Sequence, residues 1–486
     1  MKNFKTSLVC ILCIIALIPH TSGTKPVQED STILQKRLEW WQDLKFGFMI
    51  EFGIWAPWGI TESWPLCQDS YRKIVSTNDH PNDWVFDFDV YRQAYWNLAK
   101  VFYPRHFDAK DWANTAKEAG MKYIIFYAKH HDGFCMYDTK LTDYKVTSPE
   151  VPYSNHPNPD ITDRLTTAFR EAGLGVGLIY SYPDWHSPYY WKPDVPALNR
   201  RPNYDIEKEP ERWQKFIDFY QGQIRELMTG YGKIDILWLD GNWLGTEAYQ
   251  TRKMMEIARG YQPELIIGRG GDPSDYKTPE RLIPEEPLGE LWETCESISD
   301  YWVFKPFDNY RSTEELITML VDIVCKGGNL ALNIPVLPDG RLTPPAVERL
   351  EEMGEWLKVN GEAIYGTRMY HPYKDERVRY TRKGNYVYAI YVIDRLAYWA
   401  GDFGYARANQ IPQEGKDGNE MVYLTHHVDI KHVNPDPGSE IYLLGVEEPL
   451  EWETVTDGVT ITIPYSVLKS PPCKYAYSLR MQVTEK

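Results

Sequence analysis

Short apolar strands alternate with amphipathic helices from about residue 40 to residue 360, and this alternation constrains the fold more than any other feature. Buried parallel strands read as continuous apolar runs. The predicted strands are Phe46–Phe52, Tyr123–Ala128, Leu174–Ser181, Ile234–Leu239, Leu265–Gly268, Leu291–Thr294 and Asn329–Asn333. The predicted helices between and after them are Asp111–Ala119, Thr162–Ala172, Glu209–Met228, Thr313–Cys325 and Pro344–Leu357. The pattern predicts an α/β fold, a (β/α)8-like barrel. Only seven strands, and not eight, are recognised in the sequence, so the closure of the barrel is an inference.

One of these strands ends in a carboxylate. The run Ile234–Leu239 is followed directly by Asp240 and Gly241. In a barrel of this kind the carboxyl ends of the strands carry the active site. Trp238 projects to the same side as Asp240 because strand side chains alternate with period two. An aromatic ring beside a carboxylate suits a sugar poised for attack at its anomeric carbon.

The pattern changes after Asn360. Tyr386–Val392 and Val459–Ile463 are short strands, and Asp457-Gly458 before the second is a hairpin signal. We therefore predict a signal peptide at residues 1–23, a barrel at 24–369 and a β-sandwich at 370–486.

Composition excludes several classes of function. The net charge of −16 argues against nucleic acid and anionic membranes as partners. The 18 Trp and 35 Tyr residues suit contact with carbohydrate. Lys2 and Lys5 precede an apolar segment from Ser7 to Ile18, which is typical of a signal peptide and predicts a secreted or periplasmic protein with no membrane span. The cysteines that follow the predicted signal peptide are scattered and indicate neither a disulfide framework nor a zinc site. They are Cys67, Cys135, Cys295, Cys325 and Cys473.

An ordered set of motifs resembles glycoside hydrolase family 29, the retaining α-L-fucosidases. The motifs run in family order: Lys45-Phe46-Gly47-Phe48, Ala116–Tyr123, Lys129-His130-His131-Asp132-Gly133-Phe134, Leu237–Gly241, Gly328–Asn333 with Pro338-Asp339-Gly340, Gly354–Leu357 and Asn360–Gly366. The resemblance implies a barrel followed by a β-sandwich and hydrolysis of α-L-fucosyl linkages in fucosylated oligosaccharides or glycoconjugates. It implies no cofactor and no metal.

The resemblance also implies roles for single residues. A retaining glycosidase needs two carboxyl groups about 5 Å apart. Asp240 matches the nucleophile, and Glu280 is the preferred acid/base because Asp275–Glu280 is similar to a loop that carries it in some members. Glu293, in a strand-like motif, is the rival for that role. The residues expected to contact substrate are Glu51, Trp64, His130, His131, Tyr180, Trp238, Arg269 and Trp302.

Glu51 departs from the family pattern. The first strand usually ends in His-Trp-Gly, and this chain has Glu51-Phe52-Gly53, with the nearby Glu-Trp-Tyr altered to Glu62-Ser63-Trp64. An ionised glutamate only accepts hydrogen bonds, so we expect weakened or shifted specificity, which leaves a glycosidase acting on another galactose-configured sugar open. A non-catalytic carbohydrate-binding protein is a second alternative. A metal-dependent hydrolase using His130, His131 and Asp184 is a third, although the ligand spacing is poor.

Overall fold

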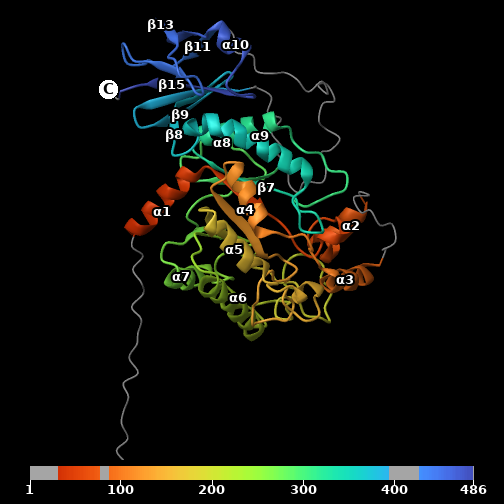
Figure 1. The fold of residues 1–486 in the computed structure, drawn as a ribbon. Helices are drawn as coiled ribbons and strands as arrows, with labels where there is room; N and C mark the ends of the chain where they lie inside the picture. Colours follow the sequence, from red (N-terminus) through yellow and green to blue (C-terminus); the bar gives the residue numbers. More distant parts are fainter. Residues whose placement is uncertain (1–30, 77–86, 393–425, 485–486) are drawn as a thin grey trace, which may run out of the picture.

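The computed structural model describes residues 31–76, 87–392 and 426–484. The predicted signal peptide lies outside these ranges. Figure 1 shows a larger unit of helices around a sheet and, next to helices α8 and α9, a smaller all-β unit that contains the carboxyl-terminal strands. No helix in the described part of the chain is long and apolar enough to cross a bilayer.

The larger unit is a parallel sheet of seven strands in the order β5-β4-β3-β2-β1-β7-β6. Their bounds are β1 Phe46–Ile50, β2 Tyr123–Lys129, β3 Gly175–Ser181, β4 Ile236–Asp240, β5 Ile266–Gly268, β6 Glu293–Ser297 and β7 Asn329–Asn333. The predicted (β/α)8-like architecture is therefore confirmed, with seven regular strands. Between β5 and β6, Lys277 and Glu280 form isolated parallel bridges with Trp292 and Cys295. This segment extends the barrel wall beyond β6 and carries Glu280.

Helices surround the barrel (Figure 1). They are α1 Ser31–Leu44, α2 Gln68–Ser76, α3 Phe88–Trp96, α4 Ala109–Glu118, α5 Ile161–Glu171, α6 Pro210–Gly230, α7 Thr251–Tyr261, α8 Thr313–Cys325 and α9 Pro344–Asn360. Several begin at the side-chain caps that such helices favour: the Asp108 carboxylate accepts from Lys110 N, and Ser312 forms a capping box with Glu315. The sequence prediction did not include α1, α2, α3 or α7.

Period-two alternation separates two cores. Along β4, Ile236 and Trp238 belong to the cluster inside the barrel, whereas Leu237 and Leu239 belong to the cluster between sheet and helices. Every residue of β4 is buried, which explains its continuous apolar sequence. The alternation decides which side chains reach the inside of the barrel.

The smaller unit is a β-sandwich. A five-stranded antiparallel sheet contains β8 Arg368–Asp375, β9 Val378–Lys383, β10 Tyr386–Tyr391, β12 Ile441–Leu443 and β15 Tyr477–Gln482. A three-stranded sheet contains β11 His427–Lys431, β13 Glu451–Val455 and β14 Gly458–Thr462, and a short helix, α10, spans Tyr465–Lys469. The two sheets share one apolar core.

The barrel and the sandwich meet at a buried ionic cluster. The Asp322 carboxylate of α8 lies 2.9 Å from Arg379 Nε of β9 and 2.7 Å from Lys326 Nζ. The first strand of the sandwich, β8, begins at Arg368, two residues before the boundary expected from the sequence.

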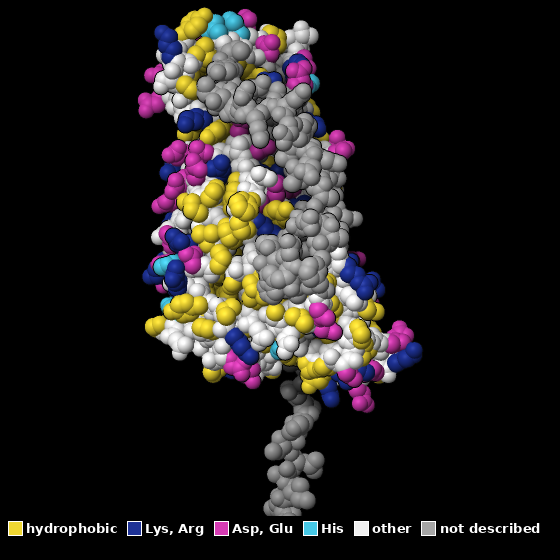
Figure 2. Space-filling model, turned by 90° about the vertical axis from the view of Figure 1, so that its right-hand side faces the viewer, with side chains coloured by type: hydrophobic (Ala, Val, Ile, Leu, Met, Phe, Trp, Pro, Cys, Tyr) yellow, Lys and Arg dark blue, Asp and Glu magenta, His cyan; other side chains and the backbone are white. Residues whose placement is uncertain are grey.

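Figure 2 shows acidic and basic side chains interspersed on one face, with hydrophobic side chains gathered over the middle of the barrel unit.

Candidate active site

A cavity of about 160 Å³ opens where the barrel strands end. Its walls come from the ends of the strands, from the loops after β1, β2, β3, β4 and β5, from the segment before β6 and from the loop after β6. The lining residues are Met49, Glu51, Glu62, Trp64, Tyr127, His130, His131, Arg200, Trp238, Asp240, Trp243, Arg269, Glu280, Cys295 and Trp302. This is the carboxyl-terminal face of the barrel, where barrel enzymes carry their chemistry.

Asp240 is the last residue of β4 and lies in this cavity. Its Oδ1 accepts from Arg269 Nε at 3.0 Å, and its Oδ2 accepts from Tyr127 OH at 3.2 Å and lies 3.3 Å from His131 Nε2. Burial by itself raises the pKa of Asp240, but the charge and the hydrogen bond of the Arg269 guanidinium hold that pKa below its usual range. Asp240 is therefore an ionised carboxylate, as a nucleophile must be.

Gly241 allows the chain to turn away directly after this carboxylate. Its φ of +77° lies in the left-handed region, and a Cβ there would come within 2.6 Å of Pro183 Cδ and 3.2 Å of His131 Cε1. Only glycine fits this close approach, because a Cβ would displace Pro183 and press on His131.

Arg269 follows β5 and connects the two candidate catalytic carboxylates. Its Nε binds Asp240, its Nη2 binds Glu280, and the guanidinium lies over the Trp238 ring at 4.6 Å from the centroid. The φ of Arg269 is +57°, an uncommon value for a non-glycine residue that turns the chain at the end of β5. The side chain of Glu280 is 43% exposed and so remains accessible to a leaving group and to water.

The structure separates the two candidates for the acid/base. Glu280 lines the cavity and Glu293 does not. Glu293 points into the barrel below it, where its carboxylate accepts from Tyr123 OH and, at 3.4 Å, from Tyr276 OH. Since Cys295 lies two residues later on the same face of β6 and lines the cavity, Glu293 belongs to the layer beneath. Burial raises the pKa of Glu293 to about 7.

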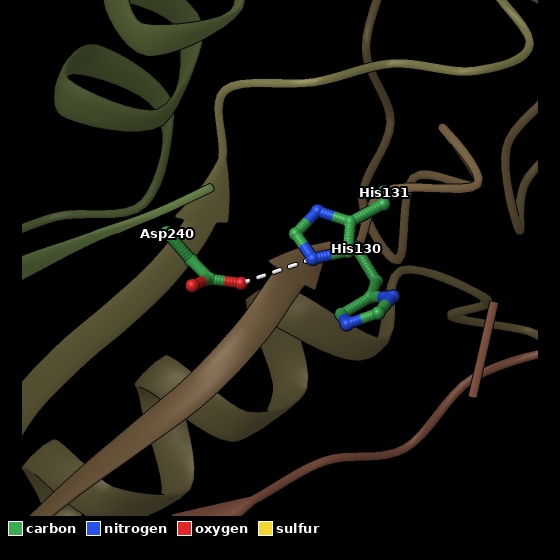
Figure 3. A group of neighbouring side chains, drawn as sticks. All are labelled: His130, His131 and Asp240. Carbon is green, nitrogen blue, oxygen red and sulfur yellow. Dashed lines mark ion pairs between the residues drawn. The ribbon is translucent and has the colours of Figure 1, made fainter. Parts of the chain in front are cut away.

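The adjacent histidines after β2 face the cavity, as shown in Figure 3 together with Asp240. His130 Nε2 lies 3.2 Å from Glu51 Oε1, and His130 Nδ1 lies 2.7 Å from Ser63 Oγ. Burial lowers the pKa of both imidazoles, and the neighbouring His130 lowers that of His131 further. Both rings are therefore neutral and can each donate one hydrogen bond.

Tyr180 is a correction to the sequence prediction. It does not line the cavity but faces outward from β3, where its hydroxyl donates to Gln223 Oε1 of α6 at 2.6 Å. Its neighbour Ser181 points inward instead, with Oγ 3.5 Å from Asp240 Oδ2. Strand alternation allows only one of two consecutive residues to face the barrel interior.

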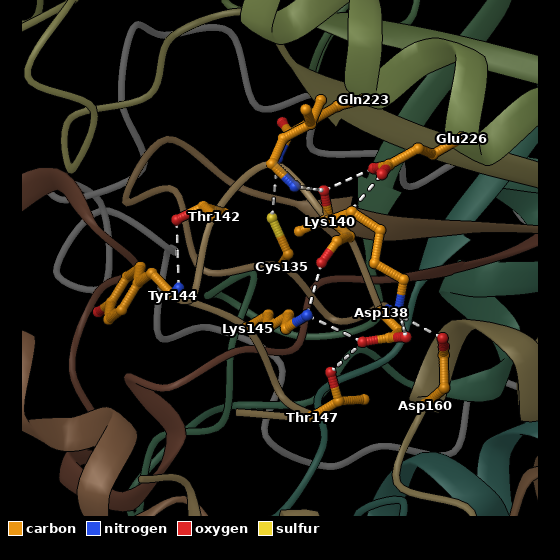
Figure 4. A network of polar contacts seen from close by, with 12 residues as sticks. Cys135, Asp138, Lys140, Thr142, Tyr144, Lys145, Thr147, Asp160, Gln223 and Glu226 are labelled. Atoms are coloured by element: carbon orange, nitrogen blue, oxygen red, sulfur yellow. Dashed lines mark hydrogen bonds and ion pairs between the residues drawn. The ribbon is translucent and has the colours of Figure 1, made fainter. Parts of the chain in front are cut away.

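The network around Gln223 supports the histidine loop from outside (Figure 4). Gln223 Nε2 donates to Cys135 Sγ at 3.3 Å, and the Glu226 carboxylate accepts from Thr139 Oγ1 and Lys140 N. Cys135 is buried, and burial raises its pKa. These contacts fix the loop that continues from His130 and His131.

Aromatic side chains form much of the wall. Trp64, Trp238 and Trp302 were predicted there, but Trp243 was not. The Trp243 ring lies 4.7 Å from His131 and 5.6 Å from Trp64, and the Arg200 guanidinium lies over it at 4.8 Å. Its position three residues after Asp240 was a usable signal, whereas Arg200 lies in the long loop between β3 and α6 and had none.

Two further residues were missed, Tyr127 and Glu62. Tyr127 is in β2, on the same inward face as Tyr123 and Ile125. Glu62 was noted only as part of an altered motif, although it is buried in the cavity wall. Burial, with the nearby Glu51 carboxyl, raises the pKa of Glu62 to about 8.

The cavity contains one group with donor atoms close enough to suit a metal. Donor atoms of His130, His131 and Asp240 lie within 4.8 Å of one another. Arg269 binds Asp240, and its positive charge opposes a divalent cation at this position. Asp184 does not join the group, because it pairs with Lys129 Nζ at 3.6 Å and accepts from the backbone N–H groups of His186 and Ser187.

Comparison with known proteins agrees with this site. Residues 16–362 match the family model described as alpha-L-fucosidase. The chain is 26% identical to an alpha-L-fucosidase of Branchiostoma floridae, over 91% of this chain and 92% of that protein, and 25% identical to the human tissue alpha-L-fucosidase, over 91% and 88%. It superposes on alpha-L-fucosidase isoenzyme 1 from Paenibacillus thiaminolyticus with a TM-score of 0.72 at 26% identity, covering 93% of this chain and 100% of that one.

A fucose complex of the Thermotoga maritima alpha-fucosidase has a TM-score of 0.67 at 26% identity, with 90% of this chain and 96% of that one covered. The family match spans the barrel and all the strands that carry the cavity. The chain is therefore a member of the alpha-L-fucosidase family of glycoside hydrolases, family 29.

Proposed function

We propose that this protein hydrolyses terminal α-L-fucosyl linkages of fucosylated glycans with retention of anomeric configuration. The observation that carries this proposal is the pairing of Asp240 and Glu280 through one arginine, Arg269, inside a cavity of the barrel. The residues of this barrel match the alpha-L-fucosidase family model. A small cavity with tryptophans in its wall suits a single terminal sugar, whose apolar C–H faces can lie against the indole rings.

The reaction then proceeds in two steps. Asp240 attacks the anomeric carbon and forms a glycosyl ester while Glu280 donates its proton to the departing oxygen. Glu280 next takes a proton from a water molecule, which attacks the same carbon and releases Asp240 as a carboxylate. Tyr127 and His131, which contact Asp240 Oδ2, hold the nucleophile in position.

The decisive experiment follows the stereochemistry and the nucleophile together. The purified protein is incubated with aryl α-L-fucosides and a panel of fucosylated and galactosylated oligosaccharides, and the first-formed anomer is identified by proton NMR. We expect release of α-L-fucose and loss of at least about 10⁴-fold in kcat for Asp240→Asn. Release of the inverted anomer, or full activity of Asp240→Asn, would contradict the proposal.

The finer part of the proposal concerns Glu51, which replaces the pocket histidine of the family pattern. Its position beside His130 supports a changed set of hydrogen bonds to the sugar hydroxyl groups. We expect poorer turnover of simple aryl α-L-fucosides than of branched fucosylated oligosaccharides. The sugars next to the fucose add contacts that compensate for the changed hydrogen bonds at residue 51, and an aryl fucoside lacks these sugars. Equal kcat/KM on both classes would count against this, and a gain on aryl fucosides in Glu51→His would support it.

A further inference from the structure

The cavity holds more carboxyl groups than cations. Among the described residues that line it there are four carboxyl groups, on Glu51, Glu62, Asp240 and Glu280, and two guanidinium groups, on Arg200 and Arg269. Arg269 is already shared by Asp240 and Glu280. The histidines add no positive charge, because burial lowers their pKa. Four ionised carboxylates in this space would leave charge that is removed from water and not compensated.

Glu51 is the carboxyl group with a built hydrogen-bond relay. It is 6% exposed, and its Oε1 lies 3.2 Å from His130 Nε2, whose ring is anchored by Ser63 Oγ at 2.7 Å from Nδ1. The serine hydroxyl can donate to Nδ1, which places the imidazole proton on Nε2 facing Oε1. A neutral Glu51 then accepts from His130 through one oxygen and can donate from the other.

Burial and the charges of several elements act on Glu51. Burial is the largest influence and raises the pKa of Glu51 well above its usual range. Asp240 at the end of β4 and Glu280 before β6 raise this pKa further, whereas Arg269 and Arg281 lower it. Glu62, on the loop after β1, is the other buried carboxyl group of the cavity that can hold a proton. The charges that act on Glu62 are those of Glu51, His130, Arg281 before β6 and Lys305 after β6. His130 also faces Asp132.

We propose that Glu51 works as a neutral carboxylic acid that donates a hydrogen bond to a hydroxyl group of the bound sugar. In this form Glu51 keeps the donor that an imidazole N–H would supply and accepts from His130 at the same time. This inference rests on the proposed fucosidase function and specifies its binding site: the pocket requires a proton on residue 51, and substrate binding weakens when that proton is lost at alkaline pH.

The test compares glutamine with alanine at position 51. Glutamine has the shape and hydrogen-bonding pattern of a neutral glutamic acid and cannot ionise. We expect kcat/KM of Glu51→Gln on an aryl α-L-fucoside to remain within about threefold of the wild type at pH 6, and Glu51→Ala to lose about tenfold. The alkaline fall of kcat/KM should move to higher pH in Glu51→Gln, and the change should be mainly in KM. Glu51→Gln as poor as Glu51→Ala would overturn the proposal.

Two controls make the result specific. Glu290→Gln makes the same substitution at an exposed glutamate outside the cavity and should reproduce the wild-type pH profile. Glu62→Gln tests the rival: if it shifts the alkaline fall of kcat/KM and Glu51→Gln does not, the essential proton is on Glu62 and the proposal is wrong.

A readout without substrate separates this inference from the proposed function. Glu62 and Glu293 also hold protons near neutral pH, so the readout is the infrared difference spectrum of the wild type minus Glu51→Gln at pH 7, which should show a protonated carboxyl band that belongs to Glu51. Thermal unfolding checks that both proteins are folded. If no fucoside is cleaved but the band is present, the proposed function fails and Glu51 is still neutral. If fucosides are cleaved and the band is absent, the inference about Glu51 fails alone.

Discussion

At the scale of single residues, carboxyl groups of the same chemistry have different surroundings in the cavity and beneath it. Asp240, Glu280 and Glu293 are all carboxylic acids, but Arg269 contacts only the first two and burial beneath the cavity isolates the third. The motif around Asp240 was sufficient to place this carboxylate at the end of a barrel strand, where it lines the cavity. The sequence preferred Glu280, in a loop, over Glu293, in a strand-like motif, but left both open, and only the three-dimensional register shows which one reaches the cavity.

Glu280→Ala tests the acid/base assignment. We expect kcat/KM to fall about 10²- to 10⁴-fold on natural fucosides, whose leaving group needs a proton, and much less on an aryl fucoside with a strongly acidic phenol. The measurement is kcat/KM for a series of aryl fucosides of increasing phenol pKa. Glu290→Gln is the control, and a loss independent of phenol pKa would refute the assignment.

Glu293 predicts a pH-dependent stability. Its pKa rises from 4.5 to about 7 on folding, so the folded protein binds this proton more tightly than the unfolded chain. The stability from Glu293 is therefore lost as pH rises from about 4.5 to 7, by at most about 3 kcal/mol. Glu293→Gln cannot ionise, and its fall in Tm between pH 5 and pH 8 should be smaller than that of the wild type. An unchanged fall would contradict the burial of an ionisable group there.

At the scale of elements, local patterns predicted most of the barrel. Strand β7 and helix α8 have the predicted bounds, because continuous apolar runs and a capping box define them locally. Strand β6 begins at Glu293 and not at Leu291, since pairing with β7 sets its register. Helix α7 was missed: no side-chain cap marks its first residue, which follows Gln250 in the left-handed conformation.

Tyr180→Phe tests the corrected orientation of β3. Removing the hydroxyl leaves Gln223 Oε1 without this donor inside the layer between β3 and α6, which should cost about 1–2 kcal/mol of stability. Because Tyr180 does not line the cavity, kcat/KM should stay within about twofold when measured well below Tm. Tyr127→Phe is the matched comparison: it removes a contact to Asp240 and should lower kcat. A large loss of kcat in Tyr180→Phe with unchanged Tm would restore the original prediction.

At the scale of the whole molecule, the sandwich is attached through charges that are buried in the contact. Arg379 of β9 and Lys326, the residue directly after α8, both face Asp322, and all three side chains are almost completely buried. The sequence predicted a β-sandwich after the barrel but gave no signal of this cluster, in which Asp322 and Arg379 are 57 residues apart.

Arg379→Met should therefore destabilise the molecule. Removing one cation from a buried ionic cluster leaves Asp322 with less compensation and should lower the free energy of unfolding by about 3 kcal/mol. Urea unfolding monitored by tryptophan fluorescence measures the change. The double variant Asp322→Asn with Arg379→Met also takes the Asp322 carboxylate away from the buried Lys326 ammonium and should be less stable than Arg379→Met alone. If the single and the double variant were both as stable as the wild type, the cluster would contribute nothing.

The sequence by itself determined the alternation of strands and helices, the family, and the place of Asp240 at a strand end, because these depend on local periodicity and on short contiguous motifs. The tertiary structure decided which residues share the cavity. It brought Arg200, Glu62 and Tyr127 into the cavity that contains Asp240, turned Tyr180 away, and enclosed Glu51 among three other carboxyl groups. Facing direction and electrostatic environment depend on register and on distant segments, and neither can be read from one stretch of chain.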